Sequence, residues 1–192
     1  MSPILASRGG VSARAYGFGS LVAPLGDYQA IMTATVDSGG ASSITFSSIP
    51  STYKHLQIRM IGRSSYTGGS GADNFNIQIN GDTTSANYYR HTLRGSGSSA
   101  DTPAGNDNLF VSAILTNNGN ANIFGALVID LLDYSNTNKN TTIRSLGGFD
   151  ANGSGYIQLE SMLWNNTAAV NQIVLGTGGW AQFSSFALYG VK

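Results

Sequence analysis

Residues 44–60, ITFSSIPSTYKHLQIRM, predict a strand, a connection and a second strand. Apolar and polar side chains alternate on both sides of Pro50, which is typical of a strand with one face on a core and the other in water. Pro50 cannot donate a hydrogen bond to a neighbouring strand, so we expect residues 47–52 to form the connection. The alternating apolar positions are Ile44, Phe46, Leu56, Ile58 and Met60.

A second stretch near the C-terminus, residues 182–191 (QFSSFALYGV), has the same period, with Phe186 and Leu188 on one face. We expect both stretches to supply central strands of one antiparallel β-sandwich. Turn residues separate further short apolar runs, which predicts an all-β sandwich of jelly-roll type for residues 27–192, without helices. The other strands are expected at residues 28–36, 73–79, 87–93, 109–115, 123–132, 143–149, 156–164 and 170–175. Residues 94–108 are expected to be irregular and on the surface.

The alternation also predicts the core. Residues 123–132, IFGALVIDLL, are apolar on both faces, which predicts a strand that is covered a second time at a subunit interface. Glu160 is expected to face the solvent, as glutamates usually do. The predicted core consists of Phe46, Leu56, Ile58, Phe75, Ile77, Val128, Ile157, Leu159, Ile173, Phe186 and Leu188.

Composition excludes several functions. The 192 residues include 10 Lys and Arg and 10 Asp and Glu, so there is no basic excess for nucleic-acid binding. Cysteine is absent, which excludes disulfides, thiolate metal sites and a cysteine nucleophile. The sequence contains no run of about 18 apolar residues that could span a membrane, and no signal peptide is evident. We therefore expect synthesis in the cytoplasm.

Residues 1–26 differ from the rest, because they contain arginines and glycines but no acidic residue. Composition alone is equally compatible with a disordered tail. We predict instead an arm that anchors the domain to a neighbouring protein. Arg8 and Arg14 would pair with carboxylates of that protein, and Tyr16 and Phe18 would fill its pockets.

The ionisable residues do not form a recognisable catalytic set. A glycosidase needs two carboxyl groups about 5–9.5 Å apart, but Asp130 and Asp133 should point to opposite faces of a strand. His55 and His91 are the only histidines, and no HxxxH or GxSxG motif is present. We therefore predict no enzymatic activity and no cofactor.

Loops and aromatic residues leave two further possibilities. Four loop residues carry oxygen ligands suited to calcium, but their sequences are also those of ordinary turns, so no metal site is predicted. They are Asn80, Asp82, Asp150 and Asn152. Aromatic side chains near loops could form a platform for sugar rings, or they could complete the core or a subunit interface. The candidates are Tyr88, Tyr89, Trp164 and Trp180, together with Tyr66.

Three stretches carry a resemblance to a known family. Residues 9–20 (GGVSARAYGFGS), 44–59 (ITFSSIPSTYKHLQIR) and 181–192 (AQFSSFALYGVK) resemble small structural proteins of tailed bacteriophages and prophages. Members are described as tail-fibre-like, minor structural or capsid-associated proteins.

The resemblance implies a virion protein without enzymatic activity, made in the host cytoplasm and forming a homotrimer. Its arm would dock on a portal, tail, adaptor or capsid protein, and its sandwich would be a tail-fibre head or a capsid decoration. Two alternatives stay open: a module that binds a host surface glycan, and a polysaccharide depolymerase whose site lies between subunits.

Overall fold

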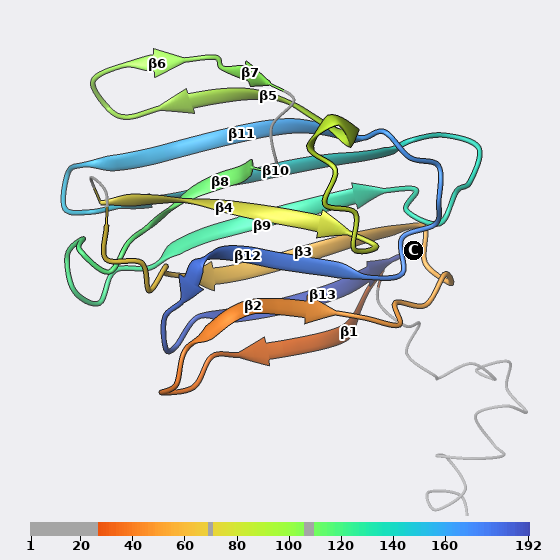
Figure 1. Cartoon of the computed structure of the whole chain (residues 1–192), viewed down its shortest axis with the longest axis horizontal. Helices are drawn as coiled ribbons and strands as arrows, with labels where there is room; N and C mark the ends of the chain where they lie inside the picture. The colour runs from red at the N-terminus through yellow and green to blue at the C-terminus, as the bar shows by residue number, and fades with distance from the viewer. Residues whose placement is uncertain (1–26, 69–70, 106–109) are drawn as a thin grey trace, which may run out of the picture.

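The computed structural model describes residues 27–68, 71–105 and 110–192, which form two facing antiparallel β-sheets (Figure 1). The larger sheet contains β1 (Tyr28–Thr35), β3 (His55–Gly62), β5 (Tyr88–Gly95), β6 (Ala100–Asp101), β7 (Ala104–Gly105), β9 (Gly125–Leu132), β10 (Thr141–Asp150), β11 (Gly155–Trp164) and β13 (Ser185–Val191). The smaller sheet contains β2 (Ala41–Phe46), β4 (Ala72–Ile79), β8 (Phe110–Leu115) and β12 (Ile173–Trp180). The predicted all-β sandwich is confirmed.

The strand order is β1-β13-β3-β9-β10-β11-β5-β6 in the larger sheet, with β7 also paired to β5, and β2-β12-β4-β8 in the smaller sheet. A 3₁₀ turn at Ser85–Asn87 precedes β5. None of the helices within the described ranges is long and apolar enough to cross a membrane. The predicted irregular segment 94–108 contains the short strands β6 and β7, so that prediction is wrong in part.

Residues 44–60 are divided between the two sheets. β3 and β13 are antiparallel neighbours, with Leu188 opposite Ile58, as expected for central strands. Residues 44–46, by contrast, belong to β2, which is an edge strand of the smaller sheet. The intervening connection therefore carries the chain from one sheet to the other. It has Ser48 at a φ of 54° and buries Ile49.

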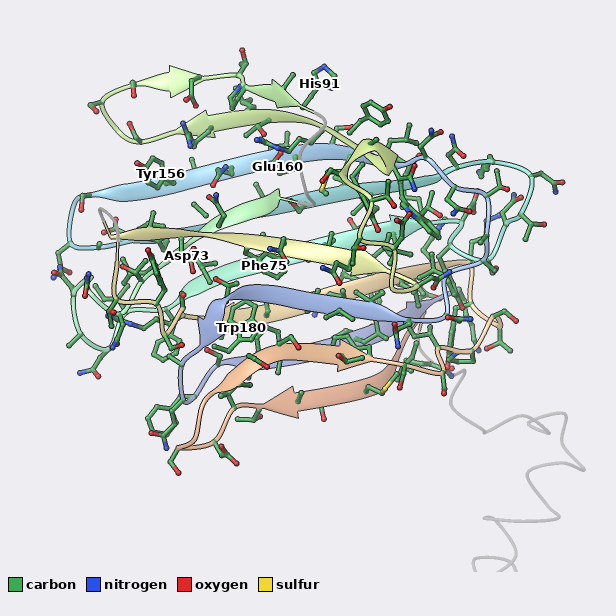
Figure 2. All side chains as sticks on the ribbon, viewed as in Figure 1. Asp73, Phe75, His91, Tyr156, Glu160 and Trp180 are labelled. Atoms are coloured by element: carbon green, nitrogen blue, oxygen red, sulfur yellow. The ribbon has the colours of Figure 1, made fainter. Side chains whose placement is uncertain are left out.

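The core lies between the sheets, and Trp180, the last residue of β12, packs into it (Figure 2). The Trp180 ring makes edge-to-face contacts with Phe75, at a centroid distance of 5.5 Å, and with Phe186, at 4.7 Å. Its Nε1 donates a hydrogen bond to the Leu175 carbonyl oxygen, so the polar atom is satisfied inside the core. Most of the predicted core is confirmed, namely Phe46, Leu56, Ile58, Phe75, Ile77, Ile173, Phe186 and Leu188.

Three predicted core residues lie instead on the outer face of the larger sheet. Val128, Ile157 and Leu159 are 37%, 65% and 44% exposed. In β11 the inward side chains are Gln158, Glu160, Met162 and Trp164. Alternation alone could not choose between the two faces of β11, because both carry large apolar side chains.

A buried arginine fixes one end of the sandwich. Arg63 is 5% exposed, and its guanidinium donates hydrogen bonds to four backbone carbonyl oxygens, at 2.6–3.2 Å. These carbonyls belong to Asn117, Gly119, Asn120 and Ile123, in the connection from β8 to β9. The backbone of Arg63 also binds the connection from β12 to β13, through Ala181 and Ser184. One residue thus joins two connections that are distant in sequence.

We expect Trp180→Ala to lower the free energy of unfolding by about 3–5 kcal/mol, because it leaves a large cavity between Phe75 and Phe186. Denaturant unfolding followed by fluorescence or circular dichroism measures the change. Tyr89→Ala is a matched control, because Tyr89 is 42% exposed and its loss should change stability by about 0.5 kcal/mol or less. Equal effects of the two substitutions would contradict the central role of Trp180.

Candidate functional site: the outer face of the larger sheet

Most of the predicted sugar-binding aromatics are buried structural residues. Trp180 is fully buried, and Trp164 and Tyr88 are each 1% exposed. Trp164 Nε1 donates to Asp82 Oδ2 (2.9 Å), and the Tyr88 hydroxyl donates to the Asp82 carbonyl oxygen (2.9 Å). Burial raises the pKa of Tyr88 to about 12. Of the two alternatives, a sugar platform and completion of the core, these three residues follow the second, and Tyr89 alone of the four is exposed.

The oxygen donors considered for calcium are used to join loops. The Asn80 side chain accepts hydrogen bonds from the backbone N–H groups of Asn171 and Gln172 and donates to Ala169. The Asp82 carboxylate accepts from Trp164, Asn87 and Thr84. Although burial opposes it, this hydrogen bonding leaves the pKa of Asp82 below its ordinary value. No group of three or more acidic or histidine side chains suited to a metal occurs among the residues whose positions are described.

Asp130 and Asp133 do not form a catalytic pair. Asp133 begins a turn at a φ of 49° and binds Lys54 and Lys139, which hold the pKa of its carboxyl group at about 2. Asp130 faces outward and binds Gln57 and Arg144. Asp133 lies beyond the end of β9, so the strand geometry used to predict the divergence of the two carboxylates does not apply to it.

Glu160 is the largest departure from prediction, because its carboxylate is fully buried. The Thr92 hydroxyl donates to Glu160 Oε2 at 2.6 Å, and Gln158 Nε2 donates to Oε1 at 3.3 Å. Gln158 in turn accepts a hydrogen bond from the Ala113 backbone N–H at 2.7 Å. This polar network joins β5, β11 and β8 where the smaller sheet ends. Figure 2 places Glu160 on β11, inside the sandwich.

Another polar cluster surrounds Asp73, but it lacks a histidine. Ser64 Oγ and Thr177 Oγ1 each donate to Asp73 Oδ2 at 2.6 Å, and the Gly178 N–H donates at 2.9 Å. His91 lies on β5 at the far margin of the larger sheet, away from Asp73 (Figure 2). The hydrogen bonds to Asp73 cross-link β4 to β12 and to Ser64.

The outer face of the larger sheet is the most unusual surface of the described structure. Strand register aligns outward-facing residues of β3, β9, β10, β11 and β5 in rows across the sheet. The first row is polar: Gln57, Asp130, Arg144, Ser161 and His91. The second is Arg59, Val128, Leu146, Leu159 and Leu93, and the third is Ile61, Ala126, Gly148, Ile157 and Gly95.

The second and third rows form an apolar outer patch of Ile61, Leu93, Val128, Leu146, Ile157 and Leu159. Ile157 is 65% exposed, and Leu93, Ile61 and Leu146 are 54%, 54% and 53% exposed. Five strands and two rows cover about 24 Å by 14 Å, or roughly 300 Å². Patches of that size on soluble proteins are often interaction sites.

A hollow of about 620 Å³ opens within this patch. The small residues Ala126 and Gly148 form its floor between Val128, Leu146 and Ile157. A side chain at Gly148 could not be accommodated, because its Cβ would lie 2.0 Å from the Tyr156 carbonyl oxygen. The β10–β11 hairpin borders the hollow on one side.

The polar first row borders the patch on the opposite side. Asp130 accepts hydrogen bonds from Gln57 Nε2 and from Arg144, both at 2.8 Å, and Arg59 Nε donates to Gln57 Oε1 at 2.7 Å. The charges of this border are therefore paired within the subunit. An apolar centre with a polar rim is the usual composition of a protein interface.

Comparison of the chain with protein-family models, with curated proteins and with solved structures finds no match. Arg8, Arg14, Tyr16 and Phe18, the predicted anchoring residues, lie outside the described residues. The outer patch was missed because Val128, Ile157 and Leu159 were assigned to the core. A signal for it did exist, since residues 123–132 are apolar on both faces and were predicted to meet a subunit interface.

Glu160→Ala should lower the free energy of unfolding by about 1–3 kcal/mol, because the buried Thr92 hydroxyl and Gln158 amide lose their acceptor. Chemical denaturation of the purified protein measures this loss. Ser161→Ala changes the next residue of the same strand on the exposed outer face and serves as the control. A Glu160→Ala protein as stable as the control would show that the network contributes nothing.

Proposed function

We propose that this protein is a structural component of a bacteriophage virion, without enzymatic activity, and that its apolar outer patch is an assembly surface. The observation that carries the assembly role is the exposed row of Val128, Leu146, Leu159 and Leu93 across adjacent strands. Leaving such side chains in water is unfavourable unless a partner covers them. The assignment to a phage rests on the sequence resemblance of residues 9–20, 44–59 and 181–192.

A jelly-roll arrangement of the sandwich has support from the strand order. Strands β1, β3, β9 and β13 face β2, β4, β8 and β12, and the chain repeatedly changes sheet between successive members of these two sets. Eight strands in two facing sheets with such crossovers are the defining feature of a jelly roll. Strands β5, β6, β7, β10 and β11 extend the larger sheet beyond this set, and three of them, β5, β10 and β11, carry four of the six residues of the outer patch.

The absence of catalysis is part of the same proposal. It is supported by the roles of the polar side chains, because Asp73, Asp82 and Asp133 are all bound in structural cross-links. A depolymerase that uses Glu160 has less support, since this carboxylate is buried within one subunit. A glycan-binding module has less support as well, because Trp164 and Trp180 are core residues.

Residues 1–26 have the proposed role of anchoring the domain to a portal, tail, adaptor or capsid protein. The domain would then be displayed on the particle as a homotrimer, either as a tail-fibre head or as a capsid decoration. The arginines and aromatic residues of the segment support this role through their chemistry alone.

Purified particles should contain the protein in stoichiometric amounts, and the double variant Leu93→Asp/Leu159→Asp should be incorporated at least about tenfold less than wild type. Two buried carboxylates at an interface would lack partners, which opposes assembly. Quantitative mass spectrometry of gradient-purified particles measures incorporation. Ser161→Asp is the control, because it adds a charge beside Leu159 in the polar row. A protein that is abundant in infected cells but missing from particles would refute the proposal.

Deletion of residues 1–20 should leave a folded domain that no longer enters particles. The reason is that the predicted anchoring residues are lost while every described strand is kept. Circular dichroism tests folding, and the same mass spectrometry tests incorporation. The Arg8→Ser/Arg14→Ser variant distinguishes loss of the two charges from loss of the whole segment. Normal incorporation of the truncated protein would contradict an anchoring role.

A further inference from the structure

The connection between β12 and β13 presents one large apolar side chain to the solvent. Phe183 is 70% exposed, more than any other large apolar residue in the described part of the chain. Its φ is 72°, in the left-handed region that Gly and Asn adopt more readily. Its backbone N–H donates to the Val36 carbonyl oxygen at 3.0 Å, so the exposed position is held by the fold. Neither the packing nor the backbone of the isolated subunit explains a phenylalanine here.

Phe183 and the hollow in the outer patch lie at the same end of the sandwich. Ser185, two residues after Phe183, pairs with Ile61, and the row of Ile61 continues through Ala126 and Gly148, which floor the hollow. Figure 1 shows the β12–β13 connection and the β10–β11 hairpin at this common end. The start of β13 and the floor of the hollow, between β9 and β10, are two and a half strand spacings apart, or about 12 Å. Phe183 therefore does not fill the hollow of its own subunit.

We propose that Phe183 of one copy inserts into the hollow of a second copy. The hollow is open, its lining residues Val128, Leu146 and Ile157 are apolar, and its volume of about 620 Å³ readily accepts a benzyl side chain. The area of the patch also favours a further contact, because the patch alone covers roughly 300 Å². A stable interface buries about 800 Å² on each partner, so the patch needs an added contact of this kind.

This contact is heterologous, because the exposed Phe183 side chain (the knob) and the hollow are different surfaces of one subunit. Until the assembly closes into a ring, the copy at one end keeps an unbound Phe183 and the copy at the other end keeps an empty hollow. The inference rests on the proposed function, since it names the partner of the assembly surface as a second copy of this chain. It also supplies a physical basis for the homotrimer expected from the phage resemblance.

Two variants test the contact in the full-length protein. Phe183→Asn removes the knob with a residue that tolerates positive φ, and Ala126→Glu places a charge in the hollow. Light scattering on a sizing column should give the wild type a mass that is a multiple of 20.0 kDa. The self-association of each variant should be at least tenfold weaker than that of the wild type. Controls are Tyr28→Asn, an exposed aromatic on edge strand β1, and Thr142→Glu, on the outer face outside the hollow. Circular dichroism verifies folding. If Phe183→Asn does not fold, Phe183→Gly takes its place.

Mixing the two variants gives the decisive result. Phe183→Asn keeps an intact hollow and Ala126→Glu keeps an intact knob, so the mixture should form a species of two chains and nothing larger. Failure to form it would overturn the inference, as would a wild type that is monomeric at tens of micromolar. So would self-association that requires residues 1–26 but not Phe183, because the arm would then occupy the hollow. Particles that contain Phe183→Asn at the wild-type level would overturn this inference while leaving the proposed function intact.

Discussion

The hydrogen bonds of Arg63 determine the geometry of the end of the sandwich where the proposed contact lies. A buried guanidinium must satisfy its donors, and here four loop carbonyls do so without a carboxylate. The same residue holds the β12–β13 connection through Ala181 and Ser184. The positions of Phe183 and of the loop that leads into β9 are therefore coupled. Arg63 thus stabilises both sides of the proposed contact from within one subunit.

The sequence predicted those parts of the fold in which one face of a strand is clearly more apolar than the other. Leu56, Ile58, Phe75 and Ile77 were placed correctly because polar residues flank each of them. In β11 neither face is clearly more apolar, because Ile157 and Leu159 lie on one face and Met162 and Trp164 on the other. Tryptophan occupies the interior, and the strand then buries Gln158 and Glu160 with it.

The candidate site was harder to predict than the core for a related reason. Aromatic and acidic residues stand out in a sequence, so Trp164, Trp180 and Glu160 were considered as surface groups, yet all three are buried. The outer patch consists of ordinary aliphatic residues whose alignment depends on the pairing of five strands. No local pattern contains that register, because the strands are separated by connections of very different length. Arg63 was overlooked for the same reason, since its partners lie more than 50 residues further along the chain.

The position of β13 has a consequence for biosynthesis. This strand is the last of the described strands in sequence, and it lies between β1, the first of them, and β3. It pairs with both along nearly its whole length. The larger sheet thus cannot form completely until β13 has left the ribosome. Such non-local pairing slows folding and leaves strand edges unpaired in the nascent chain. In the nascent chain β1 therefore lacks its sheet partner until β13 is synthesised, and deletion of β13 would remove the strand that joins β1 to the rest of the sheet.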